Sequence, residues 1–122
     1  SETYSMTKET ADILNKAKLE MLDLRHPYVG TEHLVLSILN NNNEMSEKLN
    51  KYNLTYNNFK KQIIDIIGKG TKKSEFFLYT PLLKKVISIS KIMTAGINKF
   101  FNHSGFVCFT ITTSPSNIKI VL

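Results

Sequence analysis

The stretch His26-Pro-Tyr-Val-Gly-Thr-Glu-His-Leu34 joins two helical patterns and decides the fold of the chain. Before it, the apolar residues Ile13, Ala17, Met21 and Leu24 recur every three or four positions and predict a helix over residues 7–23. Proline disfavours helical geometry in the preceding residue, so His26-Pro27 should end this helix. Thr31 is a good N-cap after Gly30, and residues 34–39 are apolar nearly all round. We therefore expect a central, buried second helix.

Two more helices are predicted in the first half of the chain. A short one covers residues 45–52, after a loop of four asparagines. Thr55 caps the next, which ends at Gly68 and Gly70. The expected buried stripe of this fourth helix contains Phe59, Ile63, Ile66 and Ile67.

The second half reads as a degenerate repeat of the first. Thr80-Pro81 is a strong helix start, and the helix should run to about Gly96. Residues 106–113 have the composition of a strand. An offset of 73 residues, however, pairs Leu14 with Ile87 and Leu36 with Phe109. We therefore expect residues 104–113 to be helical, since a lone strand would have no visible partner.

Composition and charge narrow the classes of function. The 122 residues suit one domain, and 16 Lys and Arg against 10 Asp and Glu give a net charge of +6. The lysines are spread along the chain, which favours solvated helix faces over a nucleic-acid patch, although a basic helical nucleic-acid-binding module stays open as the alternative.

No run reaches the roughly 18 apolar residues of a membrane span, and no secretion signal opens the chain. No Walker motif, catalytic triad or paired Cys/His set is visible, so we expect no catalytic residue and no metal site.

Residues 26–34 resemble the GH-x-x-[VI]-GTEHL segment of Clp N-terminal domains, especially the ClpC type. Ile67-Gly-Lys-Gly70 is similar to that family's exit from its fourth helix, and Tyr79-Thr-Pro81 followed by Lys84-Lys-Val86 resembles the opening of its second repeat. The resemblance implies an all-α, pseudo-twofold bundle of two four-helix repeats. Here residues 1–122 would form a single domain, with repeat one at about 7–70, a linker at 71–79 and an incomplete repeat two at 80–122 that lacks the eighth helix.

The resemblance also implies a function. Such domains are non-catalytic and dock adaptor proteins and unfolding substrates for an AAA+ unfoldase, which can feed a ClpP-type peptidase. The domain should be monomeric, without a cofactor of its own, without nucleic acid and without membrane contact. ATP and Mg would belong to a hexameric parent ring. The Asn- and Lys-rich composition looks most like a plastid-derived organelle such as the apicoplast, with the bacterial cytoplasm as the alternative.

The candidate binding site is Gly30, Thr31 and Glu32, at the first turn of the second helix. In ClpC proteins the Glu of this motif can read phosphoarginine, which the resemblance carries to Glu32. A carboxylate can hold a guanidinium while the helix N–H groups and the Thr31 hydroxyl hold its phosphate. The simpler alternative is an acid that only stabilises its helix. In the second repeat Gly105 takes the place of Glu32, so a second guanidinium site is not expected.

Four further features have mostly structural interpretations. We expect His33 to be packed and hydrogen-bonded, and Cys108 to be a small buried hydrophobe and not a nucleophile. The pairs Phe76-Phe77 and Phe100-Phe101 and the tyrosines Tyr52 and Tyr56 should pack in the core or linker, with an exposed apolar docking groove as the alternative.

Overall fold

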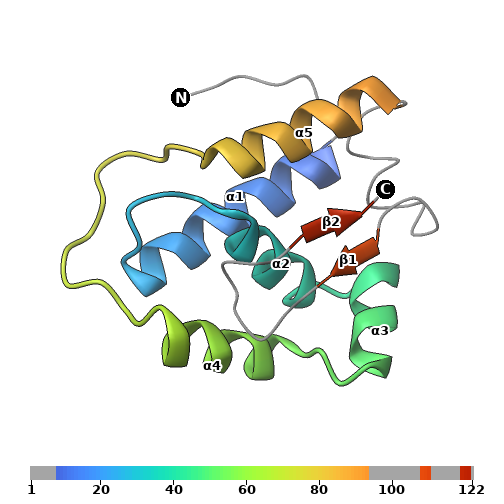
Figure 1. Ribbon diagram of the computed structural model, residues 1–122, viewed down its shortest axis with the longest axis horizontal. Helices are drawn as coiled ribbons and strands as arrows, with labels where there is room; N and C mark the ends of the chain where they lie inside the picture. Colours follow the sequence, from blue (N-terminus) through green and yellow to red (C-terminus); the bar gives the residue numbers. More distant parts are fainter. Residues whose placement is uncertain (1–7, 94–107, 111–118, 122) are drawn as a thin grey trace.

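The computed structural model describes residues 8–93, 108–110 and 119–121. In this part of the chain α2 lies at the centre, between α1 and α5 on one side and α3 and α4 on the other (Figure 1). None of the helices in the described part is long and apolar enough to cross a membrane. The elements in chain order are α1 (Lys8–Leu24), α2 (Thr31–Leu39), α3 (Glu44–Lys51), α4 (Tyr56–Ile66), α5 (Pro81–Met93), β1 (Cys108–Thr110) and β2 (Lys119–Val121).

The central position predicted for the second helix is confirmed. Every residue of α2 except Glu32 is buried, and α1 ends at Leu24, just before the His26-Pro27 pair. The predicted N-cap was wrong by one residue, because the cap is Gly30 and Thr31 is already the first helical residue. Gly30 has no side chain to cap the helix, so another group must satisfy the free backbone N–H groups of the first turn.

The starts of α3, α4 and α5 have side-chain caps, of which those at Thr55 and Thr80 were predicted. Asn43 accepts a hydrogen bond from the Ser46 N–H at 2.7 Å, and Thr55 accepts one from Asn58 at 3.2 Å. At α5, the Thr80 hydroxyl accepts from the Leu83 N–H at 3.2 Å, with Pro81 in the first helical position. A side-chain acceptor at the N-cap satisfies donors that the helix itself leaves free.

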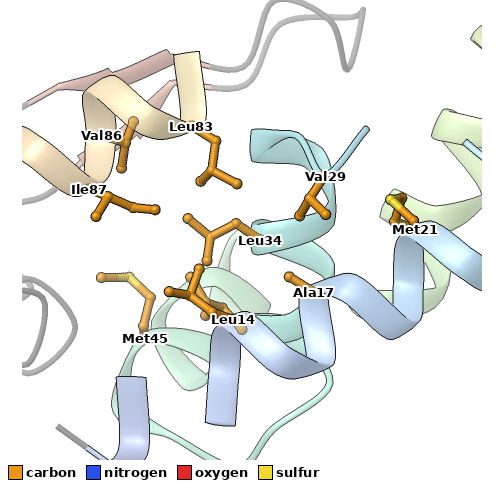
Figure 2. Close-up of a cluster of buried hydrophobic side chains, with 10 residues drawn as sticks. Leu14, Ala17, Met21, Val29, Leu34, Met45, Leu83, Val86 and Ile87 are labelled. Carbon is orange, nitrogen blue, oxygen red and sulfur yellow. The ribbon is translucent and has the colours of Figure 1, made fainter. Parts of the chain in front are cut away.

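The apolar core has two parts, one on each side of α2. The first joins α1, α2 and α5, where Leu83, Val86 and Ile87 of α5 point toward Leu34 of α2 and Leu14 of α1 (Figure 2). The second joins α2 to α4, whose contributions are Phe59 and Ile63. The complete first cluster is Leu14, Ala17, Met21, Val29, Leu34, Ile38, Met45, Leu83, Val86 and Ile87, and the complete second cluster is Leu24, Val35, Leu36, Leu39, Phe59 and Ile63.

Two residues of the predicted α4 stripe are not in the core. Phe59 and Ile63 are fully buried, but Ile66 and Ile67 are 48% and 46% exposed. The α-helix ends at Ile66, and Gly68 turns the chain away with φ of +85°. The last turn of α4 therefore extends past the surface of α2 that buries its first two turns.

The helix predicted over residues 104–113 was wrong where the structure describes it. Cys108–Thr110 form β1, which pairs antiparallel with β2 so that Phe109 lies opposite Ile120. Local composition therefore prevailed over the repeat register, and the partner strand that seemed to be missing lies a few residues further along the chain. The register does hold in α5, because Leu14 and Ile87, paired by the 73-residue offset, are buried in the same cluster. The helical class implied by the Clp resemblance is confirmed, while the domain boundaries and the absent eighth helix stay predictions.

Candidate functional site

The segments before α2 and α5 run side by side and hold the N-terminal end of α2 in place. This end, residues 30–32, is called the mouth of α2 below. The Val29 N–H donates to the Leu78 carbonyl at 2.8 Å, and the Thr80 N–H donates to the Val29 carbonyl at 2.9 Å. These two bonds form a short parallel bridge between Val29 and Tyr79. The bridge fixes Gly30, and with it the first turn of α2, against the linker.

Two histidines complete the support of this mouth. His33 Nδ1 lies 2.8 Å from the Gly30 N–H, which can only donate, so this nitrogen accepts. His33 Nε2 lies 3.0 Å from His26 Nδ1, and His26 Nε2 lies 2.8 Å from the Gly68 carbonyl, which can only accept. Because both ends of the chain of bonds are fixed, each imidazole carries its proton on Nε2. The histidine pair therefore ties the mouth of α2 to the turn that follows α4.

The environment of His33 keeps it neutral. Its side chain is fully buried, and this burial, together with the neighbouring His26, lowers the pKa of His33 to about 3. The Glu32 carboxylate oxygen lies 3.6 Å from His33 Nδ1, but a neutral ring whose Nδ1 already accepts a hydrogen bond forms no ion pair with it. The expectation that His33 is packed and hydrogen-bonded agrees with this geometry.

The same three side chains have ligand atoms within 4.8 Å of one another, a spacing that a metal ion could bridge. The hydrogen bonds explain this cluster without a metal. Both Nδ1 lone pairs already accept hydrogen bonds and both Nε2 atoms donate, so a metal would have to replace well-placed bonds at a buried pair.

Glu32 is the chemically unusual residue of the mouth. Its side chain is 20% exposed, and burial raises the pKa of Glu32 above its ordinary value, against the effects of a bond from its own backbone N–H and of His26. Within residues 8–93 no lysine or arginine forms an ion pair with it. Glu32 is therefore a partly buried acid beside a helix N-terminus, accessible to solvent and without a cationic partner in the described part of the chain.

The other two predicted site residues differ in their roles. The Glu32 carboxylate folds back over Gly30, where an added Cβ would meet Oε2 at 2.5 Å, so the glycine makes room for the carboxylate. Thr31 is only 4% exposed, which leaves its hydroxyl inaccessible to a ligand in solution. The structure thus brings Gly30, Thr31 and Glu32 together, but only Glu32 offers a side chain at the surface.

Several sequence predictions fall on residues that the structure does not describe. Gly105 and the Phe100-Phe101 pair lie outside the described residues, as does the side chain of Cys108. The aromatic residues that are described do not all pack in the core or linker, since Tyr52 is 86% exposed and Phe76 is 67% exposed.

Sequence reasoning missed two features of this region. It treated His26 only as a helix terminator, whereas the structure makes it the link between His33 and Gly68. It also treated the lysines as spread along the chain on solvated helix faces. Lys16 and Lys61 pair with acids four residues away on their own helices and Lys60 pairs with acids of α1, but Arg25, Lys72 and Lys73 gather around one hollow. The departure of Arg25 from the glycine of the GH motif was the available signal.

Comparisons with known proteins agree with the resemblance seen in the sequence. A family model described as the Clp repeat (R) N-terminal domain matches residues 5–99. The negative regulator of genetic competence ClpC/MecB of Bacillus subtilis is 33% identical over 85 residues, which is 69% of this chain and 10% of the relative. The ATP-dependent Clp protease ATP-binding subunit ClpC of Staphylococcus epidermidis is 31% identical over 86 residues, 70% of this chain and 10% of that relative.

This chain spans about a tenth of the length of the curated relatives it matches. Both are bacterial proteins, which matches the bacterial alternative for its origin and gives no support to a plastid or apicoplast.

Proposed function

This chain belongs to the Clp N-terminal domain family, and on that premise we propose that it is the docking module of a Clp-type AAA+ chaperone. In this role it receives adaptor proteins and unfolding substrates and does no chemistry itself. The longer protein would supply a hexameric, ATP- and Mg-dependent ring and could deliver clients to a ClpP-type peptidase. The names of the relatives, a Clp protease ATP-binding subunit among them, support this assignment.

The observation that carries the proposal is the Glu32 carboxylate at the mouth of α2, with which no lysine or arginine of the described residues forms an ion pair. A partly desolvated acid gains more from a cation than an acid in water does, because the protein interior screens the attraction less. A guanidinium offers this acid a forked hydrogen bond, and the dipole of the helix start favours an attached phosphate. Phosphoarginine, an arginine whose guanidinium carries a phosphate, can present the guanidinium to Glu32 and the phosphate to the start of the helix.

The His26–His33 pair supports this site without contacting the ligand. It fixes the Gly30 N–H and holds the helix mouth against the turn at Gly68. A mouth that is already rigid loses little conformational entropy when a ligand binds, which favours affinity. Because Thr31 is buried, we assign the contacts to the Glu32 side chain and to the backbone of the first turn.

Calorimetric titration with free phosphoarginine and with arginine tests the site. We expect the 122-residue chain to bind phosphoarginine more tightly than arginine, and Glu32→Gln to weaken phosphoarginine binding about tenfold, the loss of one charge-assisted hydrogen-bonded pair. Glu44→Gln is the matched control, because Glu44 is an exposed acid in the first turn of α3. Equal binding by the parent chain and Glu32→Gln would remove Glu32 from the site, while ATP hydrolysis by the isolated chain would contradict the docking role.

A further inference from the structure

The segment after α4 folds back onto the end of α1 and encloses a hollow on the surface. The Gly70 N–H donates to the Leu24 carbonyl at 2.9 Å, and the Arg25 guanidinium donates to the Thr71 carbonyl at 3.2 Å. In Figure 1 this segment passes around the C-terminal end of α1 on its way to α5. The hollow has a volume of about 390 Å³ and is lined by Arg25, Pro27 and residues 72–76. It shares no residue with the mouth of α2.

The backbone at Arg25 gives the first reason to expect a ligand here. Arg25 has φ of +56°, in the left-handed region that glycine adopts at lower cost than any residue with a Cβ. The GH motif that this stretch resembles has glycine at this position. Gly70 has no room for a Cβ, because that atom would collide with the Arg25 carbonyl oxygen, so the two backbones are in close contact. The Arg25 guanidinium is thus presented from a backbone conformation that costs an arginine more than it costs a glycine, and such outliers cluster at functional sites.

The charges around the hollow give the second reason. Three cations, Arg25, Lys72 and Lys73, line it together with a single acid, Glu75. No ion pair involves any of these three cations within residues 8–93, whereas Lys16, Lys60 and Lys61 are each paired with a carboxylate. The lining of the hollow therefore has an excess of positive charge.

The walls of the hollow are partly apolar. Phe76 is 67% exposed and lies against the same hollow as Pro27, and the adjacent Tyr28 is 50% exposed. An aromatic ring that is left this exposed beside a group of cations provides a surface for an apolar side chain of a partner. Arg25 supplies the planar fork that suits a carboxylate, and the two lysines supply charge without a fixed geometry.

We propose that this hollow docks an acidic segment of a partner protein, with carboxylates on Arg25, Lys72 and Lys73 and an aromatic or aliphatic side chain on Phe76. The hollow is compact, whereas tight binding of nucleic acid depends on several phosphates contacted along an extended basic track. The inference rests on the proposed docking role but not on Glu32. The two sites select opposite charges, one a guanidinium and the other carboxylates.

Fluorescence anisotropy tests this assignment with the 122-residue chain. The probe is a fluorescein-labelled peptide of sequence Glu-Asp-Glu-Phe-Asp-Glu, and its comparison is the amide peptide Gln-Asn-Gln-Phe-Asn-Gln. We expect the acidic peptide to bind at least about tenfold more tightly at low salt and to lose affinity as salt rises. Its binding should shift the backbone NMR signals of Arg25 and residues 72–76 more than those of Glu32.

Two variants and two controls locate the contact. Arg25→Gly removes the guanidinium at a backbone position that suits glycine, so we expect a melting temperature at least as high as that of the parent chain and a several-fold loss of peptide affinity. Lys72→Gln with Lys73→Gln should give a similar loss. Lys51→Gln with Lys85→Gln removes the same charge from exposed sites outside the hollow and should have a much smaller effect, while Glu32→Gln should have none on this peptide.

Three results would overturn the proposal. Equal affinity for the acidic and amide peptides would exclude recognition of carboxylates. Unchanged affinity in Arg25→Gly and in the Lys72/Lys73 variant would exclude the hollow. Tighter binding of a labelled oligouridylate, displaced by the peptide and weakened by the same variants, would assign the hollow to nucleic acid. If phosphoarginine binding at Glu32 fails while the acidic peptide binds, only the first site is lost.

Discussion

His33 connects the protonation state of one side chain to the shape of the helix mouth. Its Nδ1 accepts from Gly30 and its Nε2–H donates to His26, so an added proton on Nδ1 would face the Gly30 N–H and break the first bond. The same proton is taken up freely by an unfolded chain, where the pKa of histidine is close to 6.5. The unfolded state therefore binds more protons than the folded state between about pH 6.5 and pH 3.

Stability should therefore fall as the pH is lowered through this window. With the pKa of His33 lowered to about 3 in the folded chain, the free energy of unfolding should decrease by about 2 kcal/mol between pH 7 and pH 5 from this residue alone. The raised pKa of Glu32 acts in the opposite direction. At pH values just above the ordinary pKa of glutamate the folded chain binds more protons than the unfolded chain, so the free energy of unfolding falls less steeply at acid pH. Urea unfolding at a series of pH values measures the slope.

His33→Gln separates this effect from general acid denaturation. Glutamine at the third position of a helix can still accept the N–H of the cap residue, but it does not titrate. We expect the variant to lose most of the slope between pH 7 and pH 5 while remaining folded at pH 7. An identical slope in parent and variant would show that His33 does not control the acid sensitivity.

At the scale of elements, a polar link joins α4 to α1 beside the second core cluster. Lys60 Nζ donates to Asp23 at 2.7 Å and to the Tyr56 hydroxyl at 2.8 Å, and the Tyr56 hydroxyl donates to Glu20 at 2.5 Å. Burial alone would lower the pKa of Lys60, but the bonds to Asp23 and Tyr56 outweigh it and raise that pKa above its ordinary value. The hydrogen bond from Lys60 lowers the pKa of Asp23.

Lys60→Met should destabilise the chain because it leaves the Glu20 carboxylate, whose side chain is 10% exposed, without its cation. We expect the free energy of unfolding to fall by about 1–3 kcal/mol, the usual cost of stranding a buried charged group. Lys61→Met is the matched control, since Lys61 is 79% exposed and pairs with Asp65 on its own helix. That change should cost less than about 0.5 kcal/mol. Equal effects in urea unfolding would mean that the α1–α4 link contributes no more than a surface pair.

The helices were predictable because their signals are local. The caps at Thr55 and Thr80 and the apolar stripe through Ala17, Met21 and Leu24 depend on residues within one or two turns of each other. The strand at Cys108–Thr110 was mispredicted because the repeat register was given more weight than the aromatic and β-branched composition of the segment. The exposure of Ile66 depends on where α2 stops covering α4, which a periodic pattern in α4 does not contain.

The candidate site was predictable only in part, because only some of its features depend on residues that are close in the sequence. Glu32 could be identified from its place in a motif at a helix start. The lack of a cationic partner for Glu32 among the described residues and the buried position of Thr31 depend on contacts that the fold brings together. The hollow at Arg25 joins residues 46 positions apart through the bond to Thr71, and no spacing rule in the sequence brings them together.

At the scale of the whole molecule, α5 closes the core that α1 and α2 leave open. Leu83 is fully buried in the first cluster, next to Leu34 in Figure 2, whereas its neighbour Leu82 is 44% exposed. If α5 belongs to the same cooperative unit as α1 and α2, a cavity under α5 must weaken all three helices together. A helix that was only packed against an independently stable domain would unfold locally, without the other helices.

Leu83→Ala and Leu82→Ala distinguish these two arrangements. We expect Leu83→Ala to lower the free energy of unfolding by about 2–5 kcal/mol, and Leu82→Ala to lower it by less than about 1 kcal/mol. Native-state hydrogen exchange then shows where the loss falls. In Leu83→Ala the protection of the most stable amides of α2 should drop by the same free energy as that of α5, because the two helices share one core. Faster exchange confined to α5 would instead show that α1–α4 form a complete cooperative unit without it.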